Sequence, residues 1–129
     1  MSEINFQMHG LPSVYLMELD IPIDFVDDCN NYLDELMIQE DKISAANTLV
    51  GQIKTGEQLL MDHTDVRLAP FCHFLQRMAV VYINQFMEQS GQILDGNRRV
   101  EVDELWSVHS YDGDYNPIHD HGTKTVMGI

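Results

Sequence analysis

The sequence predicts an α+β fold in a single domain, residues 1–129. Two segments with apolar residues at helical spacing lie in the first two thirds of the chain, and β-branched and aromatic residues are more frequent in the last third. The chain has 129 residues, of which 44% are hydrophobic, so it can bury one core. We therefore expect two helices packed on a sheet.

The elements up to the middle of the chain follow from local patterns. The run SVYLMEL, residues 13–19, predicts a short strand, and Pro22 and Asp24 predict the start of a helix. Between residues 40 and 63 the signals are mixed, and we expect loops with one or two short strands. The apolar positions of the first helix are Phe25, Val26, Cys29, Tyr32, Leu33, Leu36 and Met37.

A second helix is predicted after Pro70, and Gly91 stands where a C-terminal cap is expected. Such an apolar stripe usually belongs to a core, so we interpret His73 on this segment as a structural residue, and His9 and His63 as ordinary surface or loop residues. The stripe comprises Phe71, Cys72, Leu75, Met78, Ala79, Tyr82, Ile83, Phe86 and Met87.

The charge of the chain argues against two kinds of partner, and its cysteines indicate a reduced state. A formal net charge of −14 disfavours partners such as nucleic acids and anionic membranes, which bind clustered Lys and Arg. Cys29 and Cys72 lie within the predicted helices, and we interpret them as buried and reduced. No leader or membrane-spanning pattern is present, so a cytoplasmic location is expected by default.

The stretch YDGDYNPIHDHG, residues 111–122, contains the strongest candidate site. A strand within residues 100–111 should lead into a turn at residues 112–117, and residues 123–129 are again strand-like. In an extended segment His119 and His121 point to one face, about 6–7 Å apart, while Asp120 points to the other. Two imidazoles suit Fe, Zn, Ni or Cu, and Asp112 and Asp114 lie nearby in sequence. The residues alone leave a metal site and a polar turn as alternatives.

The segment WSVHSYDGDYNPIHDHGTKTVMGI, residues 106–129, resembles the core of 2-oxoglutarate and Fe(II)-dependent oxygenases, in particular the phage and marine bacterial branch of the prolyl-hydroxylase-like group. The segment LVGQIKTGEQLLMD, residues 49–62, is similar in layout. The resemblance implies two helices on a partial double-stranded β-helix, an incomplete jelly-roll. It also implies Fe(II) bound by His119 and His121, with Asp120 as the alternative second ligand, and 2-oxoglutarate bound near Tyr111 and Asn116.

The chain departs from the family pattern in two ways. The usual motif is HxD or HxE, whereas this chain has HxH at residues 119–121. The distal histidine and the basic residue that pairs with 2-oxoglutarate lie downstream of the motif in the family, and this chain ends at Ile129. We therefore expect the front part of an oxygenase, inactive by itself. The alternative is a non-catalytic phage accessory or structural protein without a metal site. An unfinished barrel also predicts homo-oligomers, formed through strands near residues 100–111 and 123–129.

Overall fold

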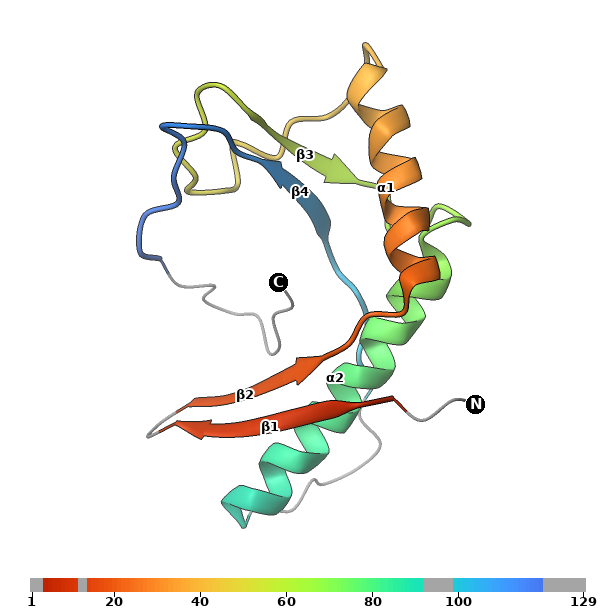
Figure 1. Ribbon diagram of the computed structural model, residues 1–129, viewed down its shortest axis with the longest axis vertical. Helices are drawn as coiled ribbons and strands as arrows, with labels where there is room; N and C mark the ends of the chain where they lie inside the picture. The colour runs from red at the N-terminus through yellow and green to blue at the C-terminus, as the bar shows by residue number, and fades with distance from the viewer. Residues whose placement is uncertain (1–3, 12–13, 92–98, 120–129) are drawn as a thin grey trace.

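The computed structural model describes residues 4–11, 14–91 and 99–119. Its fold is α+β, as predicted. The strands form two separate antiparallel sheets of two strands each, β1 with β2 and β3 with β4. Helix α2 begins near α1 and runs past the β1–β2 hairpin (Figure 1). In chain order the elements are β1 (Phe6–Leu11), β2 (Val14–Leu19), α1 (Ile23–Ile38), β3 (Glu57–Met61), α2 (Ala69–Ser90) and β4 (Leu105–His109).

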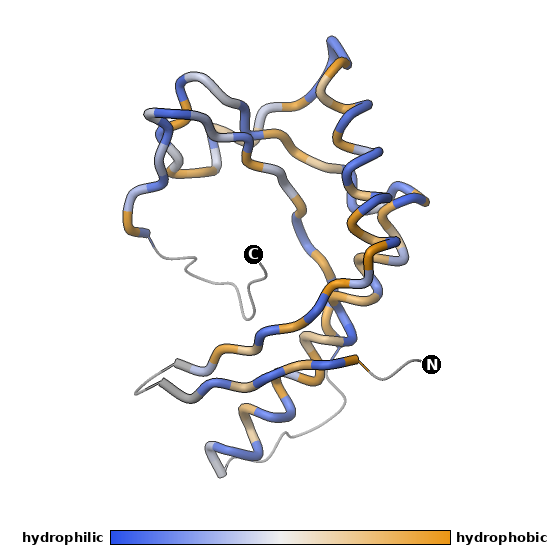
Figure 2. The backbone as a smooth tube through the Cα atoms, viewed as in Figure 1, coloured by the Kyte–Doolittle hydropathy of each residue, from blue (hydrophilic) through white to orange (hydrophobic). Residues whose placement is uncertain are grey.

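Helix α1 begins directly after Pro22, as the sequence predicted. The amides of Phe25 and Val26 donate to the Pro22 carbonyl at 3.0 and 3.4 Å, and Asp24 places a negative charge in the first turn, where the helix dipole favours it. Tyr32 and Leu36, one turn apart, are the buried residues of this helix. Along α1, hydrophilic residues interrupt the hydrophobic ones at every turn (Figure 2), which is the pattern of a helix with one face packed.

Helix α2 ends at the predicted glycine. Gly91 has φ +67°, a left-handed conformation that glycine adopts without steric cost, and its amide donates to carbonyls of the last turn. Toward this end of α2 the β1–β2 hairpin is attached by Tyr15. The Tyr82 hydroxyl donates to the Tyr15 carbonyl at 2.6 Å, and the Tyr15 ring meets the Phe86 ring edge-on at 5.1 Å.

The β3–β4 sheet contributes residues of β3 to the hydrophobic core. Its register places Leu60 opposite Trp106 and Glu57 opposite His109. On the other edge of β3, residues 43–45 add a short extension, in which the Ala45 amide donates to the Gln58 carbonyl at 2.8 Å. Short β structure within residues 40–63 was predicted, and this arrangement confirms it.

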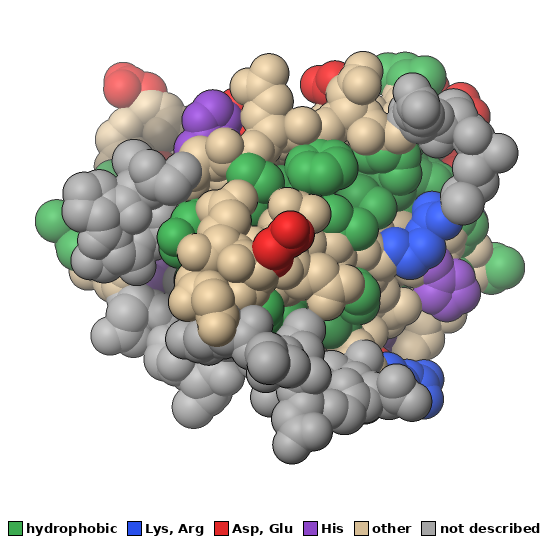
Figure 3. Space-filling view, turned by 90° about the horizontal axis from the view of Figure 1, so that it is seen from below, with side chains coloured by type: hydrophobic (Ala, Val, Ile, Leu, Met, Phe, Trp, Pro, Cys, Tyr) green, Lys and Arg blue, Asp and Glu red, His purple; other side chains and the backbone are tan. Residues whose placement is uncertain are grey.

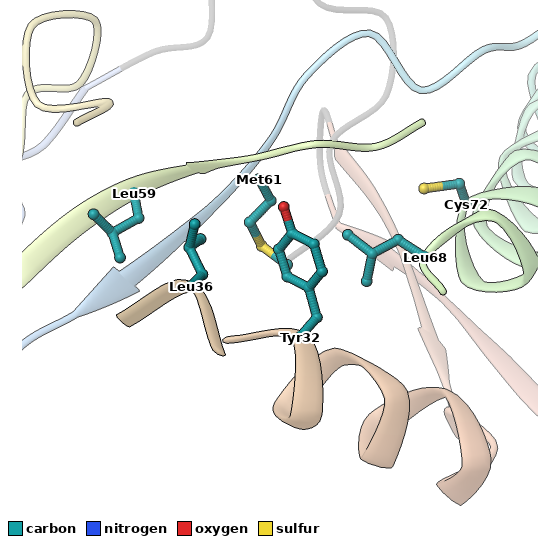
Figure 4. Close-up of a cluster of buried hydrophobic side chains, with 6 residues drawn as sticks. All are labelled: Tyr32, Leu36, Leu59, Met61, Leu68 and Cys72. Carbon is teal, nitrogen blue, oxygen red and sulfur yellow. The ribbon is translucent and has the colours of Figure 1, made fainter. Parts of the chain in front are cut away.

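A cluster of buried side chains joins α1, β3 and the start of α2 (Figure 4). Leu105 of β4 packs against this cluster. Because side chains alternate along a strand, Leu60, Trp106 and Val108 then lie on the opposite face of the sheet, where Leu60 and Val108 are each 39% exposed. We call these three residues the apolar ladder. The cluster itself comprises Tyr32, Leu36, Leu59, Met61, Leu68 and Cys72.

Both cysteines are free thiols, as expected. Cys72 is buried, and its thiol donates to the His63 carbonyl at 3.7 Å; Cys29 is only half-buried. Burial raises the pKa of both thiols, which disfavours the reactive thiolate. Their role in the fold is therefore to fill space.

The strands agree only in part with the prediction from the sequence. The first strand, β1, was not predicted, because its segment FQMHGL carries a glycine and lacks a clear alternation. The strand predicted within residues 100–111 is confirmed only at Leu105–His109. The strand predicted at residues 123–129 lies outside the described residues. Neither helix of the described part combines the length and hydropathy needed to cross a bilayer.

Candidate functional site

The predicted turn after β4 is present and is closed by its own backbone. The Asp114 amide donates to the Tyr111 carbonyl at 2.9 Å, and Gly113 adopts φ +89°, a conformation that other residues rarely tolerate. This turn leads the chain away from β4 toward Pro117 and His119. The sequence DGD, residues 112–114, therefore forms a tight turn, as its composition indicated.

The carboxylate of Asp114 binds four backbone amides. One oxygen accepts hydrogen bonds from Lys54 and Thr55 at 2.7 and 3.1 Å, and the other accepts them from Gly56 and Tyr111 at 2.9 and 3.0 Å. These backbone donors, Tyr111 first, lower the pKa of Asp114 to about 2, because they stabilise the charged form. We call this arrangement the Asp114 clamp. It fastens the turn after β4 to the loop before β3.

The clamp changes the interpretation of the acidic residues in the candidate motif. Asp114 was counted in sequence as a possible contributor to a metal site, but each of its oxygens already accepts two N–H groups. Its observed role is to hold two loops together. Asp112 is exposed and lies outside the clamp.

Two glycines allow the loop of residues 49–56 to approach the turn. A Cβ atom on Gly56 would lie 1.5 Å from the His109 carbonyl oxygen, so only glycine fits beside this end of β4. A Cβ atom on Gly51 would lie 2.5 Å from Asn116 Oδ1 and 2.7 Å from Gln58 Oε1. The mixed signals that made this loop hard to predict therefore include two glycines in close contacts, Gly56 with the backbone of β4 and Gly51 with the side chains of Asn116 and Gln58.

Asn116 is held near β3 by the backbone hydrogen bonds of the preceding residue, Tyr115. The Gln52 amide donates to the Tyr115 carbonyl at 2.8 Å, and the Tyr115 amide donates back at 3.3 Å. The Asn116 side chain then lies beside Gly51, at a point that the Gln58 side chain also borders. Gln58 is only 5% exposed, and its Oε1 has no hydrogen-bond partner. Sequence reasoning did not single out Gln58; its position in a five-residue strand, between a charged and an apolar residue, gave no signal of burial.

His119 is exposed, and its ring forms a hydrogen bond with the backbone two residues earlier. Nδ1 lies 2.8 Å from the carbonyl oxygen of Pro117. Since a carbonyl only accepts, Nδ1 carries the proton, and in the neutral ring the lone pair is on Nε2. Metal-binding histidines commonly have this arrangement, with the second ring nitrogen donating to a backbone carbonyl.

The other predicted site residues are only partly brought together. Tyr111 is 60% exposed and lies at the start of the turn, whereas Asn116 lies at its far end. His121 and the alternative ligand Asp120 lie outside the described residues, so the histidine pair remains a prediction. Among the residues that the structure describes, no three His, Cys, Asp or Glu side chains are grouped closely enough to hold a metal ion.

The remaining histidines have separate environments. His9 lies 3.7 Å from Glu18 across the β1–β2 hairpin, and His109 Nε2 lies 3.0 Å from the Ser107 hydroxyl on β4. His73 is exposed on α2, so it is not part of the packed core stripe. None of these contacts involves His119.

Two shallow depressions lie elsewhere on the described surface. One, of about 300 Å³, lies between β3 and the loop before it and is lined in part by Lys42, Ser44 and Glu57. The other, of about 440 Å³, is lined in part by His73 and Arg77 of α2. Seen from below, hydrophobic side chains gather at the centre of the face, and Lys or Arg lies beside His at one side (Figure 3). Neither depression is lined by Tyr111, Asn116 or His119.

Comparison with protein-family models, with curated proteins and with solved structures found no match for this chain.

Proposed function

We propose that the chain contains the first part of the Fe(II) site of a 2-oxoglutarate-dependent oxygenase, with His119 and His121 as metal ligands. The observation that carries the proposal is the hydrogen bond from His119 Nδ1 to the Pro117 carbonyl, at 2.8 Å. It puts the lone pair of the neutral ring on Nε2, the nitrogen that we assign to the metal, and it restrains the ring. A preset ligand loses less conformational entropy on binding.

The position of His119 relative to the sheet also supports this function. The ligand follows β4 through a tight turn, and the Asp114 clamp holds that turn against the loop before β3. α1 packs on one face of the sheet, and the apolar ladder of Leu60, Trp106 and Val108 lies on the other. We propose that β3 and β4 belong to a partial double-stranded β-helix whose inner face is this ladder.

The donor set fits the implied metal. Imidazole nitrogen is a ligand for Fe(II), and two imidazoles with open positions are compatible with non-haem iron chemistry. When bound, Fe(II) and 2-oxoglutarate would supply the chemistry that hydroxylates a C–H bond, with O₂ as the oxidant and source of the oxygen atom. The residues of this chain bind and orient the metal. We place 2-oxoglutarate near Tyr111, whose phenol is exposed and can donate a hydrogen bond to a carboxylate. Asn116, the other residue implied for this cofactor, lies instead against Gly51 and Gln58.

A non-catalytic structural or accessory module is the second candidate. It is favoured by the Asp114 clamp, because a carboxylate with four backbone donors gives the turn a complete structural role without any ligand. In that case His119 is a surface residue of a well-built turn.

Metal binding distinguishes the two candidates. We expect the purified chain, loaded anaerobically with Fe(II) or with Ni(II), to retain the metal in elemental analysis after gel filtration. His119→Ala and His121→Ala should each abolish retention, because each removes one of the two proposed ligands. His73→Ala is the matched control, since it removes an exposed imidazole far from the turn in sequence. Equal loss in all three variants, or no retention by the wild-type chain, would overturn the proposal.

A further inference from the structure

We propose that Asn116 is a positioning residue: its side-chain amide donates a hydrogen bond to Gln58 Oε1 and thereby fixes the turn that presents His119. The starting observation is the buried oxygen of Gln58. The residue is 5% exposed, its Nε2 donates weakly to the Gly51 carbonyl at 3.5 Å, and its Oε1 has no donor. A buried acceptor without a donor is unfavourable, so a donor is expected nearby.

Asn116 is the side chain placed to supply that donor. Its Oδ1 and Gln58 Oε1 border the same point beside the Gly51 Cα, at 2.5 and 2.7 Å from the position that a Cβ would take. Two acceptor oxygens on either side of one point cannot bond to each other. A half-turn of the Asn116 amide exchanges its oxygen for its NH₂ group with almost no change in shape. The NH₂ group then occupies the place beside Gly51 that Gln58 Oε1 also borders, and we infer the hydrogen bond there.

The alternative, a half-turn of the Gln58 amide, is less favourable. It would direct Gln58 Nε2 toward Asn116, but it would also bring Gln58 Oε1 against the Gly51 carbonyl, which now accepts from Nε2. Two carbonyl oxygens would then face each other. Turning Asn116 keeps the bond from Gln58 Nε2 to Gly51 and supplies Gln58 Oε1 with the donor that it lacks.

The resulting bond connects β3 to the proposed metal ligand along a short path. Asn116 precedes Pro117, whose ring fixes its own φ and restricts the residue before it. The Pro117 carbonyl in turn accepts the hydrogen bond from His119 Nδ1. Fixing Asn116 therefore restricts the backbone immediately before the carbonyl that accepts from the imidazole. This role deepens the proposed function and rests on it.

The hydrogen bond itself can be measured without metal. Asn116 and Asn47 are both exposed, so solvent access alone does not distinguish them. In nuclear magnetic resonance spectra of the wild-type chain, we expect the side-chain NH₂ protons of Asn116 to exchange with solvent about fivefold more slowly than those of Asn47. Gln58→Met removes the acceptor while keeping length and burial, so it should abolish this difference. Equal exchange of Asn116 and Asn47 in the wild-type chain would overturn the bond.

The positioning role needs a second readout, for which Co(II) is the probe. Asn116→Ala should weaken Co(II) affinity about tenfold and shift the ligand-field absorption of the bound ion, as expected for loss of an outer support of a ligand. Asn47→Ala should change neither, and circular dichroism should show that both variants fold. Asn116→Ala with unchanged affinity and spectrum would overturn the positioning role while the proposed function stands. A wild-type chain that binds no Co(II) would overturn both, even with Asn116 protected from exchange.

Discussion

Gly56→Ala tests whether the close contact between the loop and β4 is as tight as the structure indicates. The added Cβ would lie 1.5 Å from the His109 carbonyl oxygen and 2.6 Å from its carbonyl carbon. Both atoms belong to the backbone, so no side-chain rotation can relieve the overlap. The end of the β3–β4 pair, where Glu57 lies opposite His109, must open instead.

The expected cost combines two terms. Overpacking of a tight site costs about 1–3 kcal/mol, and one or two lost backbone hydrogen bonds cost about 1 kcal/mol each. The sum, about 2–5 kcal/mol, is a large part of the stability of an ordinary domain, which is about 5–15 kcal/mol. We therefore expect Gly56→Ala to lower the free energy of unfolding severely, or to prevent folding at 37 °C.

Urea unfolding measures this effect with two probes. Far-UV circular dichroism reports on the helices, and fluorescence of Trp106, the chain's single tryptophan, reports on β4. If the variant opens only the end of the β3–β4 pair, the fluorescence transition should move to lower urea than the circular dichroism transition. Gly91→Ala and Gly113→Ala are controls, because both positions have positive φ and no atom within 4 Å of an added Cβ. They should cost about 1–2 kcal/mol through backbone strain alone. The reasoning fails if Gly56→Ala is no more destabilising than these controls.

Three further predictions follow from the clamp and from the proposed site. The pKa of Asp114 is lowered to about 2, so the Asp114 clamp should stabilise the fold above the unfolded pKa of about 3.9 and lose that contribution as pH falls toward 2. Asp114→Asn should therefore flatten the dependence of the free energy of unfolding on pH between about 4 and 2. Parallel curves for the two proteins would contradict this prediction. The 129-residue chain with Fe(II) should not convert 2-oxoglutarate to succinate, because two histidines supply only part of a facial ligand set; turnover above a metal-free control would show that the ligands are misassigned. Self-association through the C-terminal strands remains a prediction, and light scattering at micromolar concentration should show a dimer or larger species. The population of this species should increase with added salt, because salt screens the repulsion between chains of charge −14. A monomer at every salt concentration would refute the prediction.

The sequence by itself determined the features that depend on neighbouring residues. Both helices were predicted because apolar side chains recur every three or four positions, and the end of α2 was predicted because Gly91 is the residue that tolerates a left-handed cap. The turn before His119 was predicted because DGDYNP combines residues that favour tight turns. Each of these signals acts over a few residues, so tertiary contacts are not needed to recognise it.

Only the tertiary structure decided which side chains of the candidate motif have a structural role. The Asp114 clamp joins Asp114 to loop amides that precede it by 58 to 60 positions in the sequence. The requirement for glycine at Gly56 arises from the backbone of β4. The same holds for Gln58, whose burial depends on the loop that contains Gly51. In one sequence an aspartate bound to distant amides cannot be distinguished from an aspartate available to a metal, because the two differ only in what the folded chain places beside the carboxylate.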